Sequence, residues 1–72
     1  MSMEQISSFA TNLKMEMQAN QLSQEALAKL VGVKQATVSR WISGYFQPDF
    51  DMLIKICKIL KTTPNVLLGW ED

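Results

Sequence analysis

A row of hydrogen-bonding side chains lies in the stretch 35–43, which reads QATVSRWIS. The row consists of Gln35, Thr37, Ser39 and Arg40. Amide, hydroxyl and guanidinium groups can recognise a ligand through its pattern of hydrogen-bond donors and acceptors. The same residue types also occur on ordinary solvated helix faces. The row is therefore available for solvent or for a ligand, and it suits recognition better than bond breaking.

Residues that catalyse reactions or bind metals are sparse in this chain. It has no histidine and one cysteine, Cys57, so neither the usual zinc-ligand sets nor an internal disulfide can be assembled. No glycine-rich phosphate loop occurs, and 72 residues leave little room for a catalytic cleft. Cys57 lies at an apolar position of a helical pattern, where a thiol usually serves as a small hydrophobic group. We expect no enzymatic activity, no metal and no cofactor.

Apolar periodicity and capping residues predict five short helices that position this row. Ser23, Asp49 and Thr63 are suitable N-caps, and Gly32 and Gly44 are suitable stops. The predicted helices cover residues 3–18, 24–31, 35–43, 50–61 and 65–68. The fold class predicted is all-α, a compact five-helix bundle that forms a single domain over residues 1–72, with a short tail at 69–72.

The stretch Ser23–Gly44 meets the demands of two helices joined by a tight turn. Such helices cross closely, so the first needs a very small residue at the crossing, and Ala28 is placed there. The turn needs a positive φ angle, which Gly32 adopts without steric cost. The buried positions are also apolar: Leu27, Val31, Val33, Val38 and Trp41. Agreement at all of these positions predicts a helix-turn-helix unit.

The sequence LSQEALAKLVGVKQATVSRWISG, followed by a proline-closed loop and two further helices, resembles the Cro and phage-repressor helix-turn-helix family, with its lambda-repressor-like fold. The resemblance covers about Leu13 to Leu68. It implies that Gln24 binds a DNA phosphate and braces the recognition helix. The residues it places at the major groove are Lys34, Gln35, Thr37, Ser39 and Arg40. Their chemistry agrees, because Gln pairs with adenine, Arg or Lys pairs with guanine, and Ser or Thr adds hydrogen bonds.

The charge of the chain is low for a DNA-binding protein. Seven Lys and Arg balance seven Asp and Glu. Between Leu22 and Pro48 the charged residues are Glu25, Lys29, Lys34 and Arg40, which leaves a local excess of positive charge. These cations allow about three phosphate contacts per monomer, against ~6 to 10 in strong binders. A monomer should bind weakly, whereas a homodimer would double the contacts and read two half-sites about 34 Å apart.

Two departures from the family pattern bear on function. An arginine late in the first helix and a glutamate ending the recognition helix often form an ion pair, and Met17 and Ile42 hold those places here. An apolar pair can replace a buried ion pair without loss of stability. The loop after Gly44, commonly rich in residues that grip phosphates, instead begins with Tyr45 and Phe46.

The fourth predicted helix carries apolar residues on two flanks. Phe50, Leu53, Cys57 and Leu60 form its expected core stripe, and Met52, Ile56 and Ile59 form a second row. The second row is either part of a wide core face or a surface for a partner. Aromatic residues and Met are enriched at protein interfaces. The candidate partner residues are Tyr45, Phe46, Met52, Ile56 and Ile59, while Trp70 is expected to pack back on the core.

Two functions fit these patterns. The first is a Cro-like transcriptional regulator of a phage-type switch between lysis and lysogeny, acting on operator DNA, on the cognate repressor, or on both. The alternative is an antirepressor, similar to small phage modulators of repression, that binds the repressor and has little DNA affinity of its own. No apolar run is longer than three residues, and the single cysteine is weakly consistent with a reduced thiol. We expect a cytoplasmic protein of a bacterial host cell that does not enter membranes.

Overall fold

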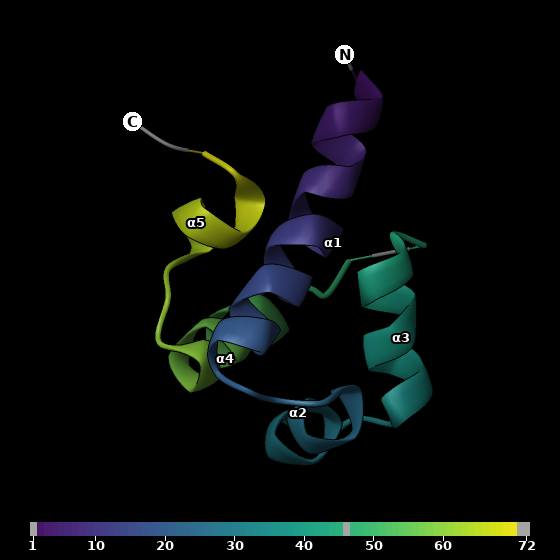
Figure 1. The fold of residues 1–72 in the computed structure, drawn as a ribbon, viewed down its shortest axis with the longest axis vertical. Coiled ribbons are helices and arrows are strands. Elements are labelled where there is room, and N and C mark those ends of the chain that lie inside the picture. Colours follow the sequence, from purple (N-terminus) through teal and green to yellow (C-terminus); the bar gives the residue numbers. More distant parts are fainter. Residues whose placement is uncertain (1, 46, 71–72) are drawn as a thin grey trace.

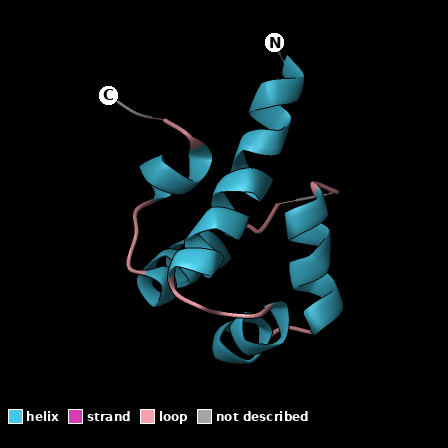
Figure 2. Cartoon of the chain, in the orientation of Figure 1, coloured by secondary structure: helices cyan, strands magenta, loops and turns pink. Residues whose placement is uncertain are grey.

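The computed structural model describes the backbone of residues 2–45 and 47–70, with side chains from Phe9 onward in these ranges. Five helices and no strands occur there (Figures 1 and 2). The helices are α1 (Ser2–Ala19), α2 (Gln24–Val31), α3 (Gln35–Ser43), α4 (Phe50–Leu60) and α5 (Pro64–Leu68). The all-α five-helix prediction is confirmed. None of the described helices combines the length and the apolar character needed to cross a membrane.

Side chains cap three of the helices at the predicted positions. In α2, α4 and α5 the residue before the helix accepts a hydrogen bond from a backbone N–H of the first turn. The pairs are Ser23 with Ala26 at 3.0 Å, Asp49 with Met52 at 2.9 Å and Thr63 with Val66 at 3.3 Å. Each cap satisfies a backbone donor that the helix itself leaves unpaired.

The long helix α1 runs through the middle of the bundle, with the other helices around it (Figure 1). It packs against α3 and α5, while α2 packs against α3 and α4. The core residues are Phe9, Leu13, Met17, Leu27, Ala28, Val31, Val38, Trp41, Leu53, Ile56, Cys57, Leu60 and Leu67. Every described helix contributes to this core, so the position of α3 depends on the packing of the whole bundle.

Three side chains join elements that are distant in the sequence. The amide of Asn12 donates to the carbonyls of Val66 and Leu67, each at 3.2 Å, and thereby ties α5 to α1. Asn20 donates to the carbonyl of Leu60 at 3.2 Å, at the end of α4. Lys55 Nζ donates to the carbonyl of Val31 at 3.1 Å, from α4 to the end of α2. This last bond supports the C-terminal end of α2, because carbonyls there have no partner within the helix.

The buried face of α4 differs from the predicted one. Ile56 is fully buried, so its predicted place on a row open to a partner is wrong. Helix α4 packs against both α2 and α5, which requires a wide buried face. Met52 and Ile59 are half-buried against the core, so the second row belongs largely to the wide core face.

Two aromatic residues predicted to join the core are on the surface. Phe50 is 70% exposed because it begins α4, where a helical side chain leans back beyond the start of the helix. Trp70 is 68% exposed, although its backbone N–H donates to the carbonyl of Asn65 at 2.8 Å. The backbone of Trp70, two residues after the end of α5, is therefore held, while its indole remains accessible to solvent.

Candidate nucleic-acid interface

The turn between α2 and α3 has the conformation that the sequence predicted. Gly32 has φ 85° and ψ 35°, in the left-handed region. Its N–H and that of Val33 both donate to the carbonyl of Ala28, at 2.8 and 3.0 Å. A Cβ at Gly32 would meet no atom within 4 Å, so the requirement for glycine comes from the backbone angle and not from crowding. This turn fixes the direction in which α3 leaves α2.

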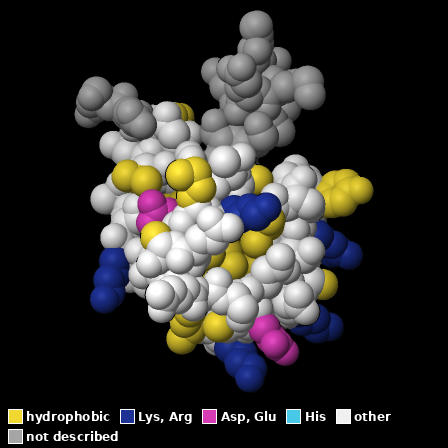
Figure 3. Space-filling model, in the orientation of Figure 1, with side chains coloured by type: hydrophobic (Ala, Val, Ile, Leu, Met, Phe, Trp, Pro, Cys, Tyr) yellow, Lys and Arg dark blue, Asp and Glu magenta, His cyan; other side chains and the backbone are white. Residues whose placement is uncertain are grey.

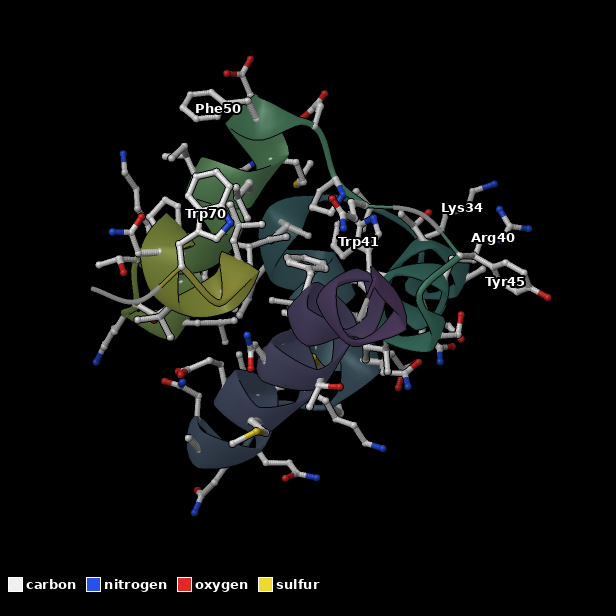
Figure 4. The ribbon with its side chains drawn as sticks, turned by 90° about the horizontal axis from the view of Figure 1, so that it is seen from above. Lys34, Arg40, Trp41, Tyr45, Phe50 and Trp70 are labelled. Carbon is white, nitrogen blue, oxygen red and sulfur yellow. The ribbon has the colours of Figure 1, made fainter. Side chains whose placement is uncertain are left out.

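Helix α3 has one buried face and one exposed face. Val38 and Trp41 are buried on the inner face, at 0% and 2% exposure. In Figure 4, Trp41 lies inside the bundle, whereas Lys34 and Arg40 extend away from it. The large indole therefore anchors α3, and the opposite face is left open to a ligand.

The predicted DNA-contacting residues are grouped on the helix-turn-helix unit. Those that are exposed are Lys34, Gln35, Ser39 and Arg40. Gln24 and Thr37 are half-buried. All six come from α3 or from the residues that begin α2 and α3, so the structure brings the predicted set together. Their contact with DNA stays a prediction.

A hydrogen bond between side chains links the starts of α2 and α3. Gln35 Nε2 donates to Gln24 Oε1 at 3.2 Å, across the turn. Gln24 is the first residue of α2 and Gln35 the first of α3. The Gln24 amide then retains its two N–H groups, which are suitable donors to phosphate oxygens. The contact therefore joins the starts of α2 and α3 and leaves the Gln24 donors available to a ligand.

The N-terminus of α3 has an unusual cap. Lys34 occupies the N-cap position, and its side chain makes no capping hydrogen bond. The first turn of α3 holds no acidic residue. Free backbone N–H groups and the helix dipole at such an end attract anions, and a lysine beside them adds positive charge. This end of α3 is suited to a phosphate group.

A family model described as helix-turn-helix matches residues 13–67, which is more than half of the chain. The chain belongs to the helix-turn-helix family of the Cro/repressor type. Members of this family are DNA-binding transcription regulators, and their ligand is double-stranded DNA. No curated protein and no solved structure matched the chain. The family match spans α2, the turn and α3, so it covers every residue of the candidate interface.

The face of the helix-turn-helix protein drawn in Figure 3 carries its positive charge in scattered positions. Lys and Arg side chains are spread around the visible face in Figure 3 and do not form one patch. Lys29, Lys34 and Arg40 are all exposed on the helix-turn-helix unit. The prediction of a modest electrostatic contribution to DNA binding rests on this small number of cations.

The loop after α3 places one predicted partner residue on the same side of the protein as two of the predicted DNA-contacting residues. Tyr45 is 80% exposed and extends toward the same side as Lys34 and Arg40 (Figure 4). Phe46 lies outside the described residues. The sequence pattern assigned Tyr45 to a protein partner because Tyr45 is aromatic. Tyr45 lies in a loop, where no helical periodicity shows the direction in which a side chain extends. By contrast, Phe50 and Trp70 lie on another side of the molecule (Figure 4).

The single thiol is placed as a core residue. Cys57 is 4% exposed, and burial raises the pKa of its thiol, which keeps it protonated at neutral pH. Among the described residues, no group of three or more His, Cys, Asp or Glu is positioned to hold a metal ion.

Proposed function

We propose that this protein regulates a phage-type genetic switch between lysis and lysogeny, with α3 lying in the major groove of operator DNA. The observation that carries the proposal is the division of α3 into two faces. Trp41 and Val38 anchor the inner face in the core, while Gln35, Ser39 and Arg40 remain exposed on the same helix. A rigid helix with exposed amide, hydroxyl and guanidinium groups has the requirements for reading base edges.

The number of cations sets the expected strength of binding. At most three phosphate contacts per monomer, if Lys29, Lys34 and Arg40 all contact phosphates, give a salt slope no steeper than about 3 × −0.9, or −2.7. A fourfold rise in salt should then weaken a monomer about 40-fold, and a dimer with twice the contacts about 1,000-fold or more. The slope therefore reports both DNA binding and whether two copies bind together as a homodimer.

Fluorescence anisotropy with labelled duplex DNA at about 50 mM and about 200 mM salt tests the proposal. Candidate operators come from the DNA beside the gene. Arg40→Ala should weaken DNA binding by ~1–3 kcal/mol if the Arg40 guanidinium pairs with a base. Lys58→Ala, which removes the same charge from an exposed site on α4, should have little effect. Absence of binding at micromolar protein in the lower salt contradicts the proposal.

An antirepressor that acts mainly by binding the cognate repressor is the second candidate function. The exposed aromatic side chains Phe50 and Trp70 favour it, as does the balance of positive and negative charge. Both aromatics lie on a side of the molecule different from Lys34 and Arg40 (Figure 4). A repressor bound there would leave α3 free, so one protein could contact both DNA and repressor.

Size-exclusion chromatography with the repressor encoded beside the gene tests this second function. A complex is expected, and Phe50→Ser with Trp70→Ser should weaken it while helicity by circular dichroism persists. Arg40→Ala is the matched surface control. Two separate peaks at tens of micromolar protein would count against the antirepressor role.

A further inference from the structure

A single hydrogen bond joins residues 24–43, the two helices and their turn, to another helix among the residues that the structure describes. Lys55 Nζ on α4 donates to the carbonyl of Val31, the last residue of α2, at 3.1 Å. We infer that Lys55 is a positioning residue, which sets the direction of α3 for base reading by holding the end of α2. This inference rests on the proposed function and adds a residue that does not touch DNA.

Bonds of the same kind hold the C-terminal ends of two other helices. Asn20 donates to the carbonyl of Leu60 at the end of α4, and Asn12 donates to carbonyls in the last turn of α5. The last carbonyls of a helix have no partner within it, so a donor from another element stabilises the end. Within the described part of the chain, the end of α3 is closed only by local donors from residues 43–45. Helix α3 therefore depends on α2 and on its own buried face for its position.

The carbonyl that Lys55 binds lies at the entrance to the turn. Val31 and Gly32 share one planar peptide unit, so a bond to the Val31 carbonyl restrains the plane that leads into the turn. The N–H groups of Gly32 and Val33 close the same turn on the carbonyl of Ala28. Helix α3 begins two residues after Val33, so a tilt of this plane would be passed on to α3. Side chains that recognise a ligand must be held within ~0.5 Å and ~10–20° of the productive geometry.

Burial of the side chain does not account for Lys55. The residue is exposed as a whole, although its bond to Val31 is partly buried. The helix dipole favours a cation at the C-terminal end of α2, which adds to the hydrogen bond. Lys58 has the same charge on the same helix and is also exposed. A comparison of Lys55 with Lys58 therefore isolates the bond to α2 from the loss of a charge.

The experiment measures anisotropy over a range of salt on a labelled operator duplex, drawn from the DNA beside the gene, and on a duplex with the same bases in shuffled order. Lys55→Met removes the donor and keeps the length of the side chain. It should weaken operator binding about 3- to 10-fold, with an unchanged salt slope. Binding to the shuffled duplex should change by less than about twofold, because it depends mainly on charge. Lys55→Arg keeps a donor and should retain most of the affinity, and Lys58→Met should bind as the wild type does.

Asn12→Ala separates positioning from overall stability. It removes the bonds that tie α5 to α1, outside the helix-turn-helix unit. This variant should melt at a lower temperature, yet it should bind the operator normally where circular dichroism shows it folded. Amide hydrogen exchange gives a second measurement that needs no DNA. In Lys55→Met the N–H groups of Gly32 and Val33 should exchange faster, whereas that of Thr62, which donates to Cys57 at the end of α4, should not.

The outcomes separate this inference from the proposed function. If the wild type binds the operator and Lys55→Met binds it equally well, the inference is overturned and DNA binding stands. A salt slope reduced by about 0.9 in Lys55→Met also overturns it, because Lys55 would then contact a phosphate. The inference fails as well if Asn12→Ala weakens binding equally, or if the wild type does not prefer the operator to the shuffled duplex. If the wild type binds neither duplex, both proposals fail.

Discussion

The two helices of the helix-turn-helix unit begin in different ways. Helix α2 starts at a Ser23 cap that accepts from Ala26 at 3.0 Å, with Glu25 in its first turn. Helix α3 starts at Lys34, which provides no side-chain cap, and its first turn has no acidic residue. A hydroxyl cap and an acidic first turn stabilise a helix, whereas a lysine opposes the helix dipole there. The start of α2 serves stability, and the start of α3 is left open to an anion.

Helices α4 and α5 follow the pattern of α2. Asp49 and Thr63 cap them with side-chain oxygens. Helix α3 is thus the only one of these four without such a cap, and its position depends on packing, chiefly through Trp41. The difference points to a division of labour, in which the core holds the recognition helix and its first turn carries no side-chain cap; there the N–H of Thr37 donates to the backbone carbonyl of Lys34 at 2.9 Å.

Removing the anchor of α3 should have the largest effect. Trp41→Ala should lower the free energy of unfolding by ~3–5 kcal/mol, because the indole is 2% exposed and its loss leaves a cavity. This is a large fraction of the stability of a small domain. Its exposed neighbour Arg40→Ala should change stability by no more than about 0.5 kcal/mol. Urea unfolding followed by circular dichroism gives both values, and equal losses would contradict the two-faced description of α3.

Removing the cap of α2 should have a moderate effect. Ser23→Ala should cost ~1 kcal/mol of stability, because the N–H of Ala26 loses its acceptor. Ser39→Ala, at an exposed position inside α3, is the matched control and should be neutral within about 0.5 kcal/mol. Thermal unfolding can rank the two. If both variants lose the same stability, Ser23 does not act as a cap.

The sequence predicted the helix-turn-helix unit closely and α4 less well. Glycine stops and hydroxyl caps are local signals, so the bounds 24–31 and 35–43 are confirmed by the structure. The burial of Ile56 depends on the packing of α4 against both α2 and α5, which no local pattern specifies. Phe50 was misplaced for a related reason, since periodicity does not show where the core ends. The Gln24–Gln35 contact was anticipated only through the family resemblance.

Adding a cap to α3 should separate stability from binding. Lys34→Ser supplies the missing hydroxyl and removes a cation from the positive end of the helix, so stability should rise by ~0.5–1 kcal/mol. DNA binding should weaken, and the salt slope should fall by about 0.9. Thermal unfolding and anisotropy on the same preparation test both effects. A variant that is more stable and binds equally well would show that Lys34 does not contact a phosphate.

Breaking the bond between the two helix starts should have the smallest effect on stability. The Gln35–Gln24 hydrogen bond is exposed, so a double-mutant cycle with Gln24→Ala and Gln35→Ala should give a coupling of ~0.5 kcal/mol or less in unfolding. In DNA binding, Gln24→Ala should reduce the affinity of the wild type. It should reduce the affinity of the Gln35→Ala variant by a smaller factor. Part of its effect would then pass through Gln35, because Gln24 orients that side chain before DNA arrives. Strictly additive losses in binding would mean that the two amides act separately on DNA.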